Sequence, residues 1–271
     1  MSPSEREPIA SPHNARIKSA AKLHKRNERD RTGSILIEGV RELSHALESV
    51  IVIEEVFCCH DLLDQKNSAP VMRAIEERRI PITAVGPKAF EKLAYREATG
   101  GLVAVARRPS SALEDLPERD CPLYLVVDSV EKPGNLGALI RSADGAGATG
   151  VIVTDPGTDL FNPNAIRSSL GTIFTMPNAT VEVSLAIHWL KVRNVTIIAA
   201  SPAAGALYTE ADFTGPCAIV VGSEDAGLGP EWRQASDHQV GIPMNGAADS
   251  LNVSVTAAIL LYEALRQRKA P

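Results

Sequence analysis

The sequence predicts an α/β fold, with a C-terminal domain built on a parallel sheet and a smaller N-terminal α/β domain. Short apolar runs alternate with helical stretches along most of the chain. In the second half these runs are apolar throughout, which is typical of parallel strands that helices cover on both faces. Residues 107–122 contain three prolines and charges of both signs, and they separate the two halves.

The domain boundaries follow from changes in composition. Residues 1–13 are polar and contain three prolines, which predicts a flexible N-terminus. We expect the first domain at 14–107, a linker at 108–121 and the second domain at 122–271. A chain of 271 residues is long enough for two such domains.

Strands are expected where apolar and β-branched residues run together, and helices where apolar residues recur at helical spacing. In the first domain the expected strands are 35–37, 50–57, 80–85 and 102–106, and the expected helices are 40–48, 71–79 and 88–93. In the second domain the expected strands are 125–127, 151–153, 195–200, 218–221 and 239–242, and the expected helices are 135–146, 184–193, 230–236 and 252–268. Asn162-Pro163 predicts a further helix start, because proline suits the first helical position after a cap.

The net charge of −5 at pH 7 excludes binding of nucleic acid through an overall positive field. A local basic patch is instead expected in residues 14–31, where Glu28 and Asp30 are outnumbered by basic residues. These are Arg16, Lys18, Lys22, Lys25, Arg26, Arg29 and Arg31. Such a stretch can neutralise phosphates, but a solvated helix face explains it equally well.

The cysteines indicate a reducing compartment. Cys58, Cys59, Cys121 and Cys217 form no C-x-x-C pair, and two adjacent cysteines make a poor structural disulfide. We therefore expect no metal site. The first residues contain no apolar signal region, and no apolar run approaches membrane-spanning length. A cytoplasmic protein without a membrane partner is expected.

One glycine motif resembles a nucleotide-binding fingerprint but has the wrong context. Residues 145–150 match G-x-G-x-x-G, which in dinucleotide-binding proteins follows a strand and opens a helix. Here the glycines close an expected helix and precede a strand. We interpret them as a helix end and turn, and a nucleotide-cofactor oxidoreductase is an alternative that rests on these glycines alone.

Three polar segments, 133–143, 221–228 and 242–255, follow expected strands of the second domain. Ligands of open α/β sheets bind beyond the carboxyl ends of the strands. Asn135 and Asn252 could each simply cap the helix that follows. If Asn135 is a cap, Arg141 can reach back over the first turn; if both are helical, they lie about 240° apart around the helix.

Together these segments resemble the signature motifs of the SpoU/TrmH family of RNA ribose 2′-O-methyltransferases. The three matches are Asn135-x-Gly137-x-x-x-Arg141-x-Ala143, Gly222-Ser223-Glu224-x-x-Gly227-Leu228, and Ile242-Pro243-Met244 with Ser250-Leu251-Asn252-Val253-Ser254-Val255. Their order and spacing agree with the family over residues 122–271. The first domain also resembles the L30e-like RNA-binding domain of family members that modify ribosomal RNA, through residues 14–31 and Leu36-Ile37-Glu38-Gly39.

The resemblance implies a deep trefoil knot in the C-terminal domain, a bound S-adenosylmethionine and a homodimer. It implies that the cofactor is held by backbone around Gly222, Ile242 and Leu251, with Val221 and Ala200 as neighbouring candidates. It implies that Arg141 is catalytic, as a base or as an electrostatic stabiliser, and that its environment is set by Asn135, Glu224, Ser250 and Asn252.

The expected function is therefore methylation of a ribose 2′-hydroxyl in RNA. The long first domain favours 23S rRNA as the substrate. A tRNA 2′-O-methyltransferase and a non-catalytic RNA-binding protein are the alternatives, and the presence of all the motif residues argues against the second.

Overall fold

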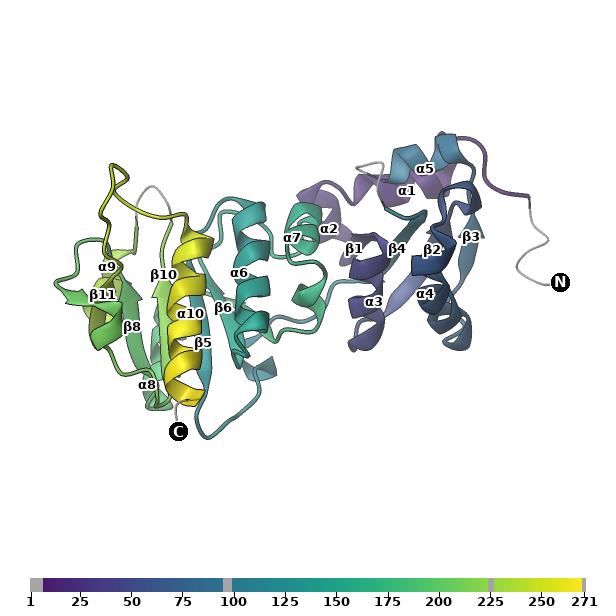
Figure 1. The fold of residues 1–271 in the computed structure, drawn as a ribbon. Helices are drawn as coiled ribbons and strands as arrows, with labels where there is room; N and C mark the ends of the chain where they lie inside the picture. Colours follow the sequence, from purple (N-terminus) through teal and green to yellow (C-terminus); the bar gives the residue numbers. More distant parts are fainter. Residues whose placement is uncertain (1–6, 95–98, 224–226, 270–271) are drawn as a thin grey trace. The chain divides into compact units, whose positions relative to one another are not determined.

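The computed structural model describes residues 7–94, 99–223 and 227–269, which form the α/β fold expected from the sequence (Figure 1). The chain divides into two compact units. Unit 1 contains Met1–Pro109 and Phe161–Thr175, and unit 2 contains Ser110–Leu160 and Met176–Pro271. Within the described part of the chain, no helix is both long and apolar enough to cross a membrane.

Unit 1 is built on a mixed four-stranded sheet with the order β1-β4-β2-β3. The strands are β1 (Ser34–Glu38), β2 (Ile53–Cys58), β3 (Ile82–Ala84) and β4 (Leu102–Arg107). β4 lies antiparallel to both β1 and β2, and β2 is parallel to β3. The expected strand 50–57 begins only at Ile53, because Val50 projects into solvent with 98% of its surface exposed.

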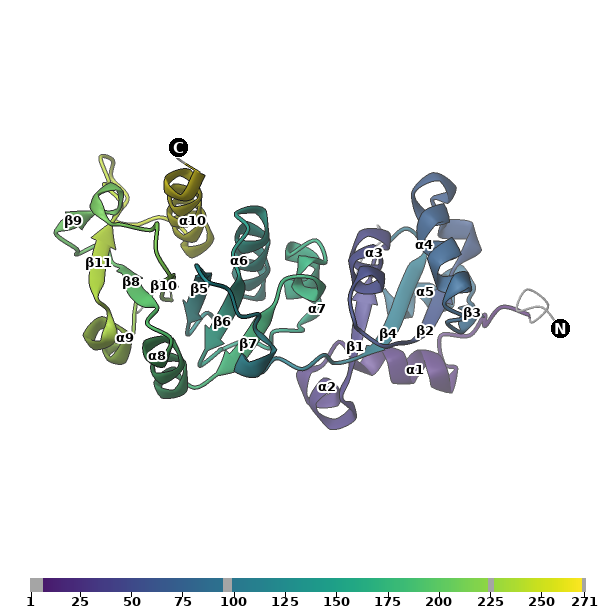
Figure 2. The same ribbon diagram turned by 90° about the horizontal axis from the view of Figure 1, so that it is seen from below.

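Helices cover both faces of this sheet (Figure 2). α1 (Ala15–Lys22) and α5 (Pro87–Leu93) share an apolar core with β1, β2 and β4. α2 (Arg26–Thr32) follows α1, so the basic stretch forms two helices. α3 (Val40–Glu48) and α4 (Gln65–Glu77) pack together on the opposite face.

Helix α4 begins six residues before the expected start at Val71. The Asp64 carboxylate accepts hydrogen bonds from the N–H groups of Lys66 and Asn67 at 3.2 and 3.4 Å, so it caps the helix. Pro70 is the sixth residue of this helix, so one backbone hydrogen bond of the helix is missing there. The expected start at Val71 is therefore wrong, and the capping aspartate marks the true one.

The ends of the expected first domain are held by hydrogen bonds. Ile9, inside the stretch expected to be flexible, donates its N–H to the Ala84 carbonyl (2.9 Å) and accepts from the Gly86 N–H (3.0 Å). At the other end, the Arg108 N–H donates to the Gly33 carbonyl at 2.8 Å. Beyond it, Leu113 and Leu116 are buried in the core of unit 2.

The segment 161–175 packs on unit 1 although it interrupts unit 2 in sequence. Its helix α7 (Pro163–Ser168) is capped by Asn162, whose Oδ1 accepts from the Asn164 N–H at 2.9 Å, as the sequence predicts. Gly171 has φ +86° and lies so close to α3 that a β-carbon would stand 2.8 Å from the Glu42 Cα. Only glycine combines this conformation with this approach. Glu42 is itself buried, and its burial raises the pKa of the carboxyl.

Unit 2 is built on a seven-stranded sheet in which every neighbouring pair is parallel. The strands, in spatial order, are β7 (Asn178–Val181), β6 (Gly150–Thr154), β5 (Leu123–Asp128), β10 (Cys217–Val221), β8 (Thr196–Ala200), β11 (His238–Gly241) and β9 (Ala206–Leu207). The two edge strands were not predicted. Asn178–Val181 contains no apolar run, and Ala206–Leu207 is too short to show a period.

Helices also cover both faces of this sheet (Figure 2). α6 (Pro133–Gly145) and α10 (Val253–Lys269) pack side by side on one face, and α8 (Val183–Val192) and α9 (Pro230–Ala235) cover the other. The glycine motif at 145–150 closes α6 and opens β6, with Gly147 at φ +70°. Its interpretation as a helix end and turn is therefore confirmed.

Arg268, in the last turn of α10, anchors that helix to the sheet. Its guanidinium donates to four carbonyls, those of Phe213 (2.8 Å), Cys121 (3.0 Å), Pro122 (3.1 Å) and Gly215 (2.6 Å). These carbonyls lie just before β5 and β10. At the opposite end of α10, Asn252 caps the first turn at the carboxyl edge of the sheet.

We expect Arg268→Ala to lower the free energy of unfolding by about 2–4 kcal/mol, because several half-buried carbonyls lose a charged donor at once. Arg119→Ala is the matched control, since Arg119 is exposed in the same unit and should change stability by less than about 0.5 kcal/mol. Urea unfolding of both variants measures the difference. Equal stabilities would contradict the anchoring role.

Candidate functional site

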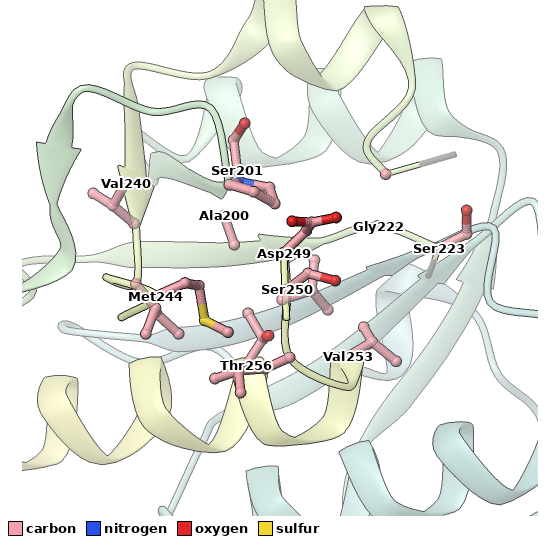
Figure 3. Close-up of a pocket in the computed structure, with 15 residues that line it drawn as sticks. Ala200, Ser201, Gly222, Ser223, Val240, Met244, Asp249, Ser250, Val253 and Thr256 are labelled. Carbon is pink, nitrogen blue, oxygen red and sulfur yellow. The ribbon is translucent and has the colours of Figure 1, made fainter. Parts of the chain in front are cut away.

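A pocket of about 290 Å³ opens at the carboxyl edge of the parallel sheet in unit 2 (Figure 3). It lies beyond the ends of β8, β10 and β11, where ligands of open α/β sheets bind. Its lining consists of Ala200, Ser201, Pro202, Val221, Gly222, Ser223, Gly227, Val240, Ile242, Met244, Asp249, Ser250, Leu251, Val253 and Thr256. Among the described residues the walls are mostly apolar, with a few hydroxyl groups and the carboxylate of Asp249.

The pocket gathers most of the residues that the sequence analysis selected. All five candidate cofactor residues line it, namely Ala200, Val221, Gly222, Ile242 and Leu251, and so does Ser250. Asn135, Arg141 and Asn252 are not part of this lining. Glu224 lies outside the described residues.

The loop after β10 depends on close backbone contact. A β-carbon on Gly222 would stand 2.3 Å from both the carbonyl carbon and the carbonyl oxygen of Gly227. Gly227 has φ +66°, and it exchanges two backbone hydrogen bonds of 3.1 Å with Ser223. These contacts close the loop on itself and present Gly222, Ser223 and Gly227 to the pocket. Both glycines are therefore required by geometry.

The first and third motifs meet through a pair of amides. The Asn252 Nδ2 donates to the Asn135 Oδ1 at 3.3 Å. The Asn252 Oδ1 accepts from the Ser254 N–H at 3.0 Å, which confirms that Asn252 caps α10. Because both ends of its amide are engaged, Asn252 holds the start of α10 against the start of α6.

Asn135 is not the cap of α6. Lys132 occupies the cap position and Pro133 is the first helical residue, so Asn135 lies within the first turn. The alternative in which Arg141 reaches back over that turn from a capping Asn135 is therefore wrong. Arg141 lies further along the exposed surface of α6, and among the described residues it has no hydrogen-bond or ion-pair partner.

The structure adds polar lining residues that the sequence analysis passed over. Ser201, Asp249 and Thr256 contribute two hydroxyls and a carboxylate. In Figure 3 the Asp249 carboxylate projects between Ser201 and Gly222. The sequence contained one signal for it, since Asp249 directly precedes the Ser250 of the third motif.

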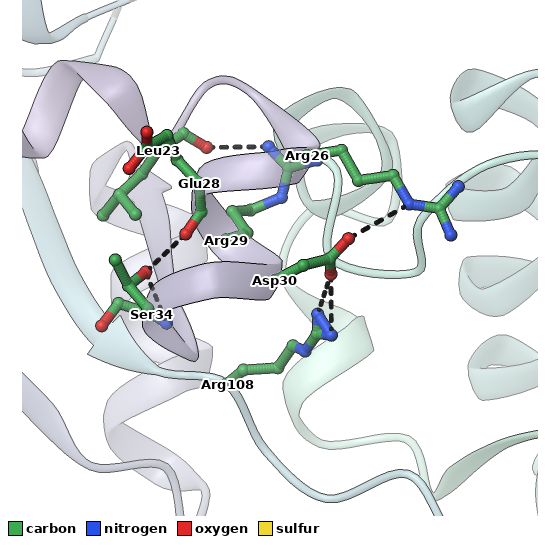
Figure 4. Close-up of polar contacts among 8 residues, drawn as sticks. Leu23, Arg26, Glu28, Arg29, Asp30, Ser34 and Arg108 are labelled. Atoms are coloured by element: carbon green, nitrogen blue, oxygen red, sulfur yellow. Dashed lines mark hydrogen bonds and ion pairs between the residues drawn. The ribbon is translucent and has the colours of Figure 1, made fainter.

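The basic stretch of unit 1 divides into structural and free cations. Arg29 is buried and donates to the carbonyls of Leu23 (2.7 Å) and His24 (2.9 Å) (Figure 4). Asp30 accepts from both terminal nitrogens of Arg108 at 2.6 and 3.0 Å and pairs with Arg26 at 3.6 Å. Arg16 pairs with Glu55 and Arg31 with Glu28. The exposed side chains of Lys18, Lys22 and Lys25 make no hydrogen bond or ion pair within the described part of unit 1.

The cysteines are free thiols in the structure. Burial raises the pKa of Cys58 and of Cys217 to about 11, so both are protonated at neutral pH. In residues 7–94, 99–223 and 227–269, no cluster of three or more His, Cys, Asp or Glu side chains is placed to hold a metal ion.

Comparison with known families identifies the class of protein. A model of the SpoU rRNA methylase family matches residues 122–262, and a model of the MRM3-like substrate binding domain matches residues 14–104. The chain therefore belongs to the SpoU rRNA methylase family.

Individual relatives match along nearly their whole length. A 23S rRNA (uridine(2479)-2′-O)-methyltransferase of Streptomyces viridochromogenes is 34% identical over 97% of this chain and 95% of the relative. The 23S rRNA (guanosine(2553)-2′-O)-methyltransferase RlmP of Bacillus subtilis is 32% identical over 94% of this chain and 97% of the relative.

Solved structures show the same fold. The crystal structure of an RNA 2′-O ribose methyltransferase superposes with a TM-score of 0.87 at 42% identity, covering 97% of this chain and all of the other. The SpoU methyltransferase AviRb from Streptomyces viridochromogenes, solved in complex with the cofactor AdoMet, superposes with a TM-score of 0.86 at 32% identity. That match covers 94% of this chain and 98% of AviRb.

We expect Gly222→Ala to destabilise unit 2 by about 2–3 kcal/mol, because the new methyl group would overlap the Gly227 carbonyl and force the loop open. Gly205→Ala serves as control, since a β-carbon there meets nothing within 4 Å. Thermal unfolding of the two variants tests this directly. A Gly222→Ala protein as stable as the control would show that the loop can rearrange at no cost.

Proposed function

We propose that the protein is an S-adenosylmethionine-dependent methyltransferase that methylates a ribose 2′-hydroxyl of 23S ribosomal RNA. The observation that carries this proposal is the pocket at the carboxyl edge of the parallel sheet, which the second and third motif segments line. Support comes from the full-length relatives, which are named as 23S rRNA 2′-O-methyltransferases.

The pocket suits the proposed cofactor. Its volume of about 290 Å³ lies near the lower end of the usual range for small-molecule sites, about 300–1,000 Å³. Ala200, Val221, Gly222, Ile242 and Leu251 would supply apolar walls and backbone groups to an adenosine. The Asp249 carboxylate suits the positively charged ammonium group of the methionine part of the cofactor. S-adenosylmethionine supplies an electrophilic methyl group on a positively charged sulfur.

Arg141 is proposed to act on the RNA hydroxyl. A ribose 2′-hydroxyl is a weak nucleophile at neutral pH and needs alignment and stabilisation of the charge that develops on its oxygen. A guanidinium is effectively always protonated, so Arg141 is assigned as an electrostatic stabiliser rather than a base. Its exposed position on α6, without a partner among the described residues, leaves it available to RNA. Asn135, Ser250, Asn252 and Glu224 are proposed to position the reacting groups.

Unit 1 is proposed to bind RNA through its free lysines. Lys18 and Lys22 are four residues apart and so share one face of α1, and Lys25 occupies the cap position at the start of α2. Their compact charges remain exposed to solvent, as phosphate binding requires. The proposed domain limits are 14–107 for RNA binding, 108–121 for the linker and 122–271 for methyl transfer.

Three further properties belong to the proposal. They are a trefoil knot in unit 2 and a homodimer, which the family resemblance implies, and a cytoplasmic location, which the cysteine pattern indicates and where ribosomal RNA would be met. Sedimentation of the purified protein tests the second of these.

We expect Arg141→Ala to lower the rate of methyl transfer at least 100-fold while the cofactor dissociation constant changes less than about threefold, because only the developing charge loses its partner. Arg233→Ala, at another exposed arginine of unit 2, is the control and should keep full activity. Transfer of a radiolabelled methyl group to ribosomal RNA measures the rate. Substantial turnover by Arg141→Ala would remove Arg141 from the mechanism.

We expect the triple variant Lys18→Gln/Lys22→Gln/Lys25→Gln to weaken RNA binding about 10-fold or more at low salt. The slope of log affinity against log salt concentration should become shallower by the amount expected for the loss of about two phosphate contacts. The control triple, Lys66→Gln/Arg73→Gln/Arg78→Gln, removes the same charge from the exposed residues in and just after α4, on the opposite face of the sheet. Titration of labelled 23S rRNA fragments at several salt concentrations compares the two. Equal losses would indicate a general charge effect.

A further inference from the structure

Asp128 is a buried carboxylate at the carboxyl end of an interior strand of the parallel sheet. It is the last residue of β5, and only 2% of its surface is exposed. Its Oδ1 accepts a hydrogen bond of 2.9 Å from the hydroxyl of Thr154, the last residue of the neighbouring strand β6. Its Oδ2 accepts a bond of 3.1 Å from the N–H of Gly229, which lies 101 residues further along the chain.

Core packing does not account for a carboxylate at this place. Burying an ionised group costs free energy that its hydrogen bonds must offset, and an apolar residue of similar size would avoid that cost. The strand residues before it, Leu125, Val126 and Val127, are all apolar and fully buried. What the carboxylate adds is a fixed position for the Gly229 N–H.

Gly229 ends the loop that forms one wall of the pocket. Two residues earlier, Gly227 is bonded to Ser223 through both its N–H and its carbonyl, each at 3.1 Å. The Gly227 carbonyl lies against Gly222, and all three of these residues line the pocket. Leu228, between Gly227 and Gly229, is buried in the core. The bond from Gly229 to Asp128 therefore holds the far end of the loop that begins after β10.

The backbone that follows Asp128 leads to α6, the helix that carries the first motif. Ser129, the next residue, has φ +52° and donates its N–H to the Thr154 carbonyl at 2.9 Å. The chain then enters α6, which carries Asn135 and Arg141. One residue thus connects the start of α6 to the loop that lines the pocket.

We infer that Asp128 is a positioning residue of the methyl-transfer site, through which the pocket-wall residues 227–229 are fixed relative to the strand that leads into α6. The inference rests on the proposed function for its catalytic meaning. Asp128 is not among the pocket-lining residues. It acts on the ligand only through Gly229, and its effect falls on cofactor affinity and not on the chemical step.

Asp128→Asn tests this inference. The substitution keeps the size of the side chain but removes its charge and one of its two acceptors, so the bond from the Gly229 N–H is weakened even if the amide oxygen faces it. We expect the dissociation constant for S-adenosylmethionine to rise about 10- to 100-fold, as for the loss of a charged hydrogen bond. The rate at saturating cofactor should stay within about threefold of the parent. Equilibrium dialysis with the radiolabelled cofactor measures the affinity.

Thr154→Val is the matched control, because it removes the other hydrogen bond of the same carboxylate without touching the loop. We expect its thermal stability to fall like that of Asp128→Asn and its cofactor affinity to stay within about twofold of the parent. If Thr154→Val weakens binding as much as Asp128→Asn, or if neither variant weakens it, the positioning role is overturned. Asp128→Ser, which is smaller and keeps an acceptor, replaces Asp128→Asn if that variant does not fold.

Hydrogen exchange at the Gly229 amide separates this inference from the proposed function. Without any cofactor, the amide should lose protection in Asp128→Asn and keep it in Thr154→Val. Unchanged exchange in Asp128→Asn overturns the inference. A parent protein that binds no S-adenosylmethionine overturns the proposed function, while the exchange result still decides whether Asp128 fixes the loop.

Discussion

The parallel pairing of all seven strands is the constraint on which the rest of unit 2 depends. Because neighbouring strands run the same way, every strand ends at the same edge of the sheet. Segments that are far apart in sequence, after β8, β10 and β11, are therefore brought together around one pocket. The topology decides where the site lies, and the loops decide what it can bind. Close backbone contacts within the loops, such as that between Gly222 and Gly227, shape what the pocket can bind.

Much of this arrangement can be predicted from the sequence, because an apolar strand followed by a polar segment has few alternative placements in an α/β protein. The five central strands and the pocket segments were found in this way. The edge strands β7 and β9 were missed because partly exposed or two-residue strands leave no pattern. The cap of α6 was open to two interpretations, although Pro133 already favoured an earlier start. Asp249 and Gly229 were passed over because their roles depend on contacts that no local pattern encodes.

The basic stretch of unit 1 illustrates a different limit. In the sequence its seven cations look alike, but the fold uses the four arginines within the unit, as partners of carboxylates or carbonyls. Arginine suits this work because its planar fork can serve several acceptors at once. The three lysines remain in water, where compact charges are well hydrated. The division between structural and free charge thus follows the chemistry of the two side chains, but only the fold reveals it.

Asn252 and the residues before it also bear on how the protein is made. The pocket takes part of its wall from residues 242–256, whereas its other lining residues precede them in the chain. A ribosome that has translated as far as β10 has produced most of the sheet but no complete pocket. The bond between Asn252 and Asn135 joins residues 117 positions apart, and Asn252 follows β11, so the bond forms only after all seven strands of the sheet have been synthesised. A nascent chain consequently cannot draw on its small-molecule ligand for stability, and the sheet must hold together by its own core until the last helix docks.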